Sequence, residues 1–304
     1  MRISSSQITD NALKSLQKNL EKLTTSRQKV LDGKKFTKAS DAPLEMQKSL
    51  AIKVSLSQNT RYLKRIEDSL SSLQSREITL SQNQEYMQQA KEIAMSANNG
   101  TLTSQDRSNL ADQVNGILEG MASLANEKIQ GAYAWGGTKT SQAPFAIVRN
   151  EKQEILQANY VGNQEENQVS IGKDEKMTVN IPGDQAFSSS FASLIKLRDS
   201  LQNKGGLSET DQVKQISASL TDINNSSEQT LNLSVKTGNS INRLQTRQSN
   251  LEQENIQKET RISQIEDADI PTTVVQMTTA ETAYNATLYT ISRSNTGGLL
   301  NYLG

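Results

Sequence analysis

The spacing of apolar residues is the feature that most constrains how this chain can fold. Mainly apolar side chains, interrupted by polar ones such as Asn59, Gln248 and Asn255, recur in steps of three and four residues through the stretches 13–30, 56–87, 110–124, 241–265 and 274–291. Such steps keep side chains on one face of an α-helix, and a sustained repeat near 3.5 residues is typical of helices packed in narrow coiled-coil seams. We therefore expect long helices that pack along thin apolar faces.

Proline is scarce, and its positions limit where such helices can begin and end. The stretches 44–139 and 183–270 contain none and leave room for helices of many turns. Thr103, which follows a break at Asn98-Asn99-Gly100, is the expected N-cap of a further helix. The four prolines of the 304 residues are Pro43, Pro144, Pro182 and Pro271.

The composition fits thin seams better than a thick globular core. Only 34% of the residues are hydrophobic, against roughly 45–50% apolar residues in an average globular domain. The chain has no histidine and no cysteine, which excludes disulfides, cysteine nucleophiles, histidine-based triads and metal sites built from these side chains. The 33 basic residues balance 33 acidic ones, which argues against nucleic-acid binding, and no run of about 18 apolar residues predicts a membrane span.

The helical rhythm stops between about residues 136 and 183. Four short runs there are rich in β-branched and aromatic residues and are divided by Gly, Asn and charged residues, as short strands are. We expect a small antiparallel β-domain inserted between two helical arms. In such a chain the N- and C-terminal helices can pair only if they run antiparallel beside each other. The four runs are PFAIVRN, EILQANYVG, NQVSIG and KMTVNIPG.

No pattern of catalytic residues stands out in the chain. Three groups of carboxylates could hold a cation or act as acid and base, but solvated surface clusters are far commoner, and we expect these groups to be solvated. Trp135 and Tyr133 are expected to pack at the junction of helix and β-insert rather than to stack on a ligand. The three groups are Glu165-Glu166, Asp174-Glu175 and Glu266-Asp267-Asp269.

Several segments resemble the flagellin superfamily, and specifically its hook-associated protein 3 family, whose members form the junction between flagellar hook and filament. The order and spacing of the segments are more specific than any one of them. In the family's signature loop, Ser40, Asp41 and Pro43 match the pattern, whereas Ala42 stands where an acid is common and Phe36 where an aliphatic residue is common. The segments are the opening 1–5, the loop 33–43, the lead into the β-domain at 136–145, and the closing pattern at 266–269, 284–288 and 299–303.

The resemblance implies a mainly α fold with three parts. Residues 1–40 and 271–304 would pair as an inner coiled coil of terminal helices. Residues 44–135 and 186–268 would form a long antiparallel helical-bundle or coiled-coil rod, and residues 136–185 a small inserted antiparallel β-domain on the outside. We expect this outer β-domain to be peripheral to assembly.

Apolar stripes on the terminal helices are the candidate site. An isolated helix pair buries little, so the stripes are either a seam within the chain or contacts with neighbouring subunits in a tube, and both interpretations stay open. Gly297-Gly298 is expected to end the C-terminal helix. The stripes consist of Leu13, Leu16, Leu20 and Leu23, of Met277, Tyr284, Leu288 and Ile291, and of the following Leu299, Leu300, Tyr302 and Leu303.

The resemblance implies a structural adaptor of the extracellular bacterial flagellum and not an enzyme. It would contact hook-associated protein 1 on one side and flagellin on the other, and copies of itself in a ring or tube. The resemblance also implies type III export in an unfolded state and a cytosolic export chaperone on the C-terminal helix. The opening lacks the pattern of a cleaved signal peptide, and we expect no cofactor, nucleic acid or membrane partner.

Three other functions stay open at this point. A flagellin-type filament subunit is the nearest, although the opening MRISSSQ and the ending LLNYLG favour the junction family. A cytoplasmic coiled-coil signalling module, such as a chemoreceptor-like hairpin, would not need the β-insert. An enzyme carried on a flagellin scaffold would need a larger insert, because about 50 residues without histidine cannot supply a zincin site.

Overall fold

Long helices dominate the part of the chain that this computed structural model describes, which is residues 5–98 and 102–300. The prediction of a mainly α fold with a small antiparallel β region is confirmed. The chain divides into two compact units. Residues 1–58 and 253–304 form the first unit, and residues 59–252 form the second. The helices are α1 (Ser5–Asp32), α2 (Pro43–Ala97), α3 (Ser104–Ala125), α4 (Ser189–Leu201), α5 (Glu209–Glu266) and α6 (Ile270–Leu300), and a π-helical turn (Asp184–Ser188) leads into α4.

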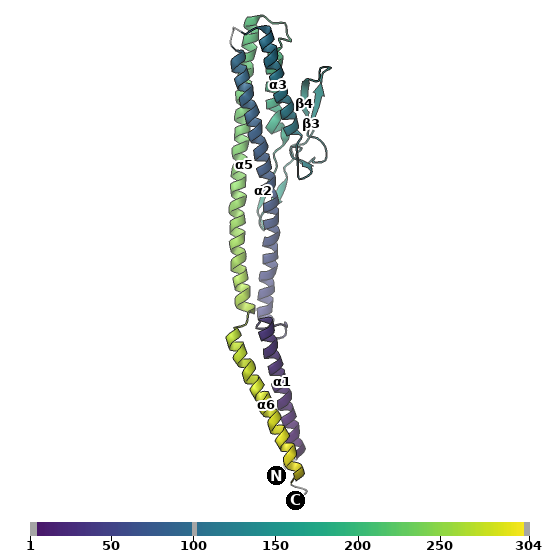
Figure 1. The fold of residues 1–304 in the computed structure, drawn as a ribbon, viewed down its shortest axis with the longest axis vertical. Coiled ribbons are helices and arrows are strands. Elements are labelled where there is room, and N and C mark those ends of the chain that lie inside the picture. Colours follow the sequence, from purple (N-terminus) through teal and green to yellow (C-terminus); the bar gives the residue numbers. More distant parts are fainter. Residues whose placement is uncertain (1–4, 99–101, 301–304) are drawn as a thin grey trace. The chain divides into compact units, whose positions relative to one another are not determined.

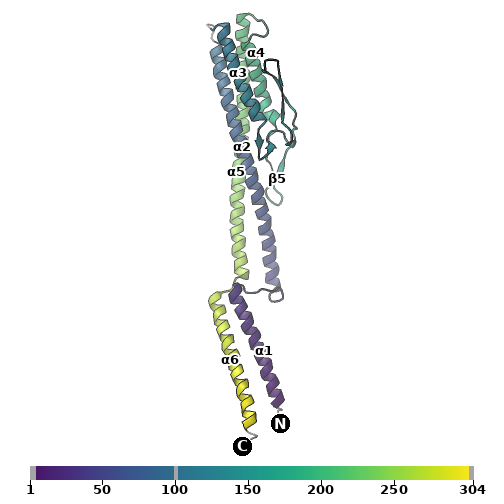
Figure 2. The same cartoon turned by 45° about the vertical axis from the view of Figure 1, so that its right-hand side comes forward.

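In the first unit, α1 and α6 lie side by side in both views (Figures 1 and 2). Asn19 of α1 donates to the hydroxyl of Thr287 at 2.9 Å, and Arg27 pairs with Glu281 at 3.4 Å. The residue numbers rise along one helix as they fall along the other, so the two helices are antiparallel. The predicted antiparallel pairing of the terminal helices is therefore confirmed.

The second unit contains most of the buried apolar side chains. On α2 the buried positions follow the predicted steps of three, four and seven residues, and α5 faces them in the antiparallel direction. Polar contacts fix this register, because Asn83 donates to Thr230 at 3.2 Å and Gln84 to Ser227 at 2.6 Å. The buried apolar residues of α2 include Ile66, Leu70, Leu73, Leu80 and Met87.

Helix α3 begins where the sequence predicts. The hydroxyl of Thr103 accepts a hydrogen bond from the backbone of Asp106, and the carboxylate of Asp106 accepts one from the backbone of Thr103. This reciprocal capping box satisfies two backbone donors at the helix start. The prediction of Thr103 as an N-cap is therefore confirmed.

In the part of the chain that the structure describes, the strands form three separate two-stranded antiparallel sheets. Strands β3 (Phe145–Arg149), β4 (Ile155–Tyr160), β5 (Gln168–Ser170) and β6 (Lys176–Thr178) lie in the four predicted runs, and β3 pairs with β4 as β5 does with β6. The sequence did not predict the hairpin of β1 (Lys128–Ile129) and β2 (Ala132–Tyr133). Its two-residue strands are too short to show alternation, and its turn places both Gln130 and Gly131 at positive φ.

The hairpin of β3 and β4 lies beside α3 (Figure 1) and shares its buried core with α3 and α4. Phe145 packs on Phe187 and Phe191, and Trp135 meets Phe187 edge-on at 5.0 Å between ring centroids, which confirms that Trp135 is a packing residue. Buried Arg198 donates to the carbonyl of Ile155. Excision of the β segment would therefore open the helical core.

Gly33 and Gly238 are expected to respond to alanine in opposite directions. Gly33 follows α1 at φ +65° with no atom within 4 Å of an added Cβ, so Gly33→Ala suffers only backbone strain and should lower the free energy of unfolding by roughly 1–2 kcal/mol. Gly238 lies inside α5, and an added Cβ there would also meet no atom within 4 Å. Gly238→Ala should therefore raise the free energy of unfolding by about 0.5–1 kcal/mol. Denaturant unfolding followed by circular dichroism measures both, and shifts of the same sign would contradict the two backbone assignments.

Candidate assembly surface and helix joint

The structure divides the predicted stripes of α1 and α6 into a buried and an exposed part. Leu23 is 5% exposed and lies in the seam between the two helices. Leu13 and Leu20 are each 46% exposed, and Leu288 is 40% exposed. The half-buried members of the stripes are Leu16, Met277, Tyr284 and Ile291.

The three exposed leucines of the predicted stripes lie on one side of the α1–α6 pair. Leu13, Leu20 and Arg27 follow one another at seven-residue steps, and so do Glu281 and Leu288, which keeps each series on one helix face. The Arg27–Glu281 ion pair joins the two series. We call Leu13, Leu20 and Leu288 the outer leucines.

A hollow of about 560 Å³ also runs along the α1–α6 pair. Lys22 and Ser26 of α1 and Thr279, Ala280 and Ala283 of α6 are among its lining residues. Its lining is mostly small or polar, and the outer leucines are not part of it. The pair therefore has two different exposed surfaces.

The end of α6 departs from the expectation. The helix continues through Gly297-Gly298 and ends at Leu300, so the prediction that these glycines end it is wrong. A helical glycine is only about 1 kcal/mol less favourable than alanine, and two of them are not sufficient to stop a helix. Leu299 and Leu300 belong to its last turn, and Tyr302 and Leu303 lie outside the described residues.

The signature loop and the closing pattern, which are far apart in the sequence, meet in the first unit. The backbone nitrogen of Lys35 donates to the carbonyl of Glu266 at 2.6 Å, and that of Ala268 donates to the carbonyl of Gly33 at 2.8 Å. Lys34 and Asp267 form an antiparallel β-bridge between these contacts. We call residues 33–35 and 264–268, together with their partners on α2, the helix joint.

Glu266 is the buried centre of this joint, at 6% exposure. Its carboxylate accepts hydrogen bonds from Ser49 and Lys53 of α2, and Lys34 lies 3.3 Å from its second oxygen. Burial alone would raise the pKa of Glu266, but the hydrogen bonds from Lys53, Ser49 and Lys34 outweigh it and leave that pKa below its ordinary value. The prediction of a solvated carboxylate is therefore wrong for Glu266.

The neighbouring acids of the closing pattern are less buried. Asp267 accepts a hydrogen bond from Lys34 at 2.7 Å, which lowers the pKa of Asp267 and raises the pKa of Lys34. Asp269 is exposed and accepts from the hydroxyl of Thr272 in the first turn of α6. The acids of the other two groups are exposed, as predicted: Glu165, Glu166, Asp174 and Glu175.

The signature residues themselves take little part in the joint. Ser40 and Asp41 are exposed and hydrogen-bonded to each other at 3.2 Å, and Pro43 begins α2. The loop is anchored instead by two lysines. Lys34 donates to Asp267, and the ammonium group of Lys35 donates to the carbonyl of Gln264 at 2.6 Å. Sequence reasoning missed this anchor, although two lysines in one motif and adjacent acids in the other were a signal for it.

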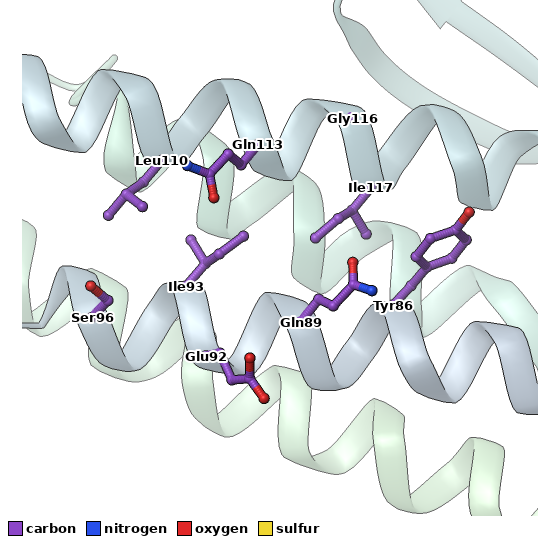
Figure 3. Close-up of a pocket in the computed structure, with 9 residues that line it drawn as sticks. All are labelled: Tyr86, Gln89, Glu92, Ile93, Ser96, Leu110, Gln113, Gly116 and Ile117. Atoms are coloured by element: carbon purple, nitrogen blue, oxygen red, sulfur yellow. The ribbon is translucent and has the colours of Figure 1, made fainter.

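An open groove between α2 and α3 offers space but little chemistry. It encloses about 650 Å³, and Figure 3 shows Ile93 of α2 and Leu110 and Ile117 of α3 directed toward one another across it. Glu92 is its charged lining residue. Within residues 5–98 and 102–300, no cluster of three or more potential acidic metal ligands occurs, and no helix is long and apolar enough to span a membrane.

Comparison with known proteins places these features in a family context. Residues 3–132 match the bacterial flagellin N-terminal helical region. Flagellar hook-associated protein 3 of Escherichia coli K12 is 25% identical over 203 residues, which cover 64% of this chain and 60% of that protein. This chain is similar to flagellar hook-associated protein 3. The resemblance predicted from the sequence is thus confirmed, over about 60% of the length of that relative.

Solved structures of hook-associated protein 3 share the fold. Flagellar hook-associated protein-3 of Legionella pneumophila has a TM-score of 0.62 at 13% identity, covering 71% of this chain and 98% of that structure. FlgL of Bacillus cereus has a TM-score of 0.58 at 22% identity, covering 70% of this chain and 99% of that structure. At these identities the likeness establishes the fold alone.

Proposed function

We propose that this chain is a structural subunit of the bacterial flagellum that joins the hook side to the filament. The observation that carries the proposal is the row of outer leucines on the α1–α6 pair, in a chain similar to hook-associated protein 3. Exposed leucines on a paired helix surface fit burial against other subunits better than contact with water. Because each of these leucines is already partly covered, its complete burial would contribute about 1–2 kcal/mol to association.

The proposed arrangement has three parts. Residues 1–40 and 271–304 form an inner coiled coil, residues 44–135 and 186–268 the rod, and residues 136–185 an outer β region. The predicted stripes are the assembly surface, with Leu13, Leu20 and Leu288 in contact with neighbouring copies in a ring or tube. The antiparallel pairing of α1 and α6 supports this assignment, since it places the two predicted stripes on neighbouring helices.

The proposed partners follow from the same resemblance. They are hook-associated protein 1 on the hook side, flagellin on the filament side, and a cytosolic export chaperone on α6 before assembly. Export through the flagellar type III apparatus fits a chain without cysteine, because no disulfide can obstruct an unfolded chain in a channel. The role is structural and not catalytic.

A deletion strain tests this function. We expect cells without the protein to build hooks, to lack attached filaments and to release flagellin monomers into the medium, and we expect the intact gene to restore filaments. A deletion strain that still builds filaments of normal length would contradict the proposal. If hooks are also lost, the protein acts earlier in assembly than proposed.

A further inference from the structure

We propose that Glu266 is an ionic latch that fixes the signature loop and the first turns of α2 to the end of α5, and thereby keeps the α1–α6 pair from opening by itself. The latch joins positions that lie far apart in the chain, since Ser49 and Lys53 precede Glu266 by 217 and 213 residues. The joint therefore forms only when the segments 33–53 and 264–268 have come together. The inference concerns the free chain and does not depend on the junction role.

The geometry makes the carboxylate charge the essential feature of the joint. One oxygen of Glu266 accepts from both Ser49 and Lys53, and the other faces the ammonium group of Lys34 at 3.3 Å. A glutamine at this position has nearly the same shape but only one acceptor oxygen. Its amide nitrogen, itself a donor, would face either the ammonium group of Lys34 or the donor groups of Ser49 and Lys53. Glu266→Gln therefore removes the latch with little change in packing.

The α1–α6 pair is the part of the first unit that depends on this anchor. Its seam holds Leu23 as a buried leucine, whereas Leu13, Leu20 and Leu288 stay exposed. A helix pair with so thin a seam is marginal by itself. The backbone contacts of Gly33 and Lys35 with the segment 266–268 hold the loop that leads into α2 on the segment that leads into α6.

Hydrogen exchange on the full chain tests the latch directly. In Glu266→Gln, amides of α1 and α6 should exchange at least about tenfold faster than in the unchanged protein, because a hydrogen-bonded charge is lost. Amides of α3 and α4, in the second unit, should keep their rates within about twofold. The matched control is Glu259→Gln, which neutralises an exposed carboxylate on the same helix and should change neither set.

Lys53→Met provides a second variant that does not depend on how well Glu266→Gln folds. It should accelerate exchange of α1 and α6 in the unchanged background and add little in the Glu266→Gln background, because the two groups act through one contact. Unchanged exchange of α1 and α6 in either single variant would overturn the proposal. Equal acceleration of α3 and α4 would also overturn it, because the effect would then be global.

Acid provides an independent readout. The groups that face Glu266 are Lys34 from the loop, Ser49 and Lys53 from α2, and Asp267, which follows it in the chain. Because the folded pKa of Glu266 is lowered, its contribution is complete above its unfolded pKa of about 4.3 and is lost as pH falls through the lower folded value. Exchange protection of α1 and α6, corrected for intrinsic rates, should fall over this range and fall less in Glu266→Gln; parallel curves would contradict the latch.

Discussion

Replacing the three outer leucines with alanine is expected to abolish attachment of filaments while leaving the free chain folded. Leu13, Leu20 and Leu288 are 46%, 46% and 40% exposed, so their truncation removes little burial within one subunit. In the proposed assembly each of them is covered by a neighbouring copy, and the triple variant should lose on the order of 3–6 kcal/mol per subunit of association free energy. Electron microscopy of a complemented deletion strain measures attachment, and circular dichroism of the purified variant measures folding.

Two matched variants separate assembly from stability. Leu23→Ala truncates a leucine at 5% exposure in the α1–α6 seam, so it should destabilise that pair in the free chain by about 2–5 kcal/mol. Val235→Ala truncates an exposed apolar residue of α5, outside the terminal helices, and should still restore filaments. Normal filaments with the triple variant, at normal export, would mean that the outer leucines do not contact neighbouring subunits.

Phe187→Ala is expected to have the largest effect on the stability of the second unit. The ring is fully buried and packs edge-on against Trp135 at 5.0 Å and Phe145 at 6.1 Å between centroids. Its loss leaves a cavity where the π-helical turn, the β3–β4 hairpin and α4 share one core, and the expected decrease in unfolding free energy is about 3–5 kcal/mol. Denaturant unfolding monitored by the fluorescence of Trp135 reports on this core directly.

Leu231→Ala is the control for this prediction, because Leu231 is an exposed apolar residue of the same unit. We expect it to change the unfolding free energy by less than about 0.5 kcal/mol. If Phe187→Ala is as mild as Leu231→Ala, the aromatic cluster is not the core of the unit. A large effect confined to Phe187→Ala supports the shared core of helices and strands.

The helices and the main strands were predictable because each leaves a local pattern. The buried positions of α2 repeat every three, four or seven residues, and Thr103 has the capping chemistry of a helix start. Strands β3 to β6 are separate β-rich runs between turn residues. In all of these the signal lies within a few residues of the structure that it predicts.

The parts that were missed depend on contacts between distant residues. Nothing near Glu266 in the sequence shows that Ser49, Lys53 and Lys34 will surround it, and a cluster of acids ordinarily indicates a solvated surface. The division of the stripes into buried Leu23 and exposed Leu20 likewise depends on how α6 lies against α1. A seven-residue pattern predicts which residues share a helix face, but not what fraction of each side chain a partner helix covers.

Labelling of intact flagella with gold-conjugated antibodies tests the proposed junction role most directly. An antibody against an epitope tag inserted in the exposed segment Ser141-Gln142 should mark a single narrow band where the hook meets the filament. Labelling along the whole filament would identify a filament subunit instead. Absence of label from flagella in cells that produce and export the tagged protein would contradict a structural role at the junction.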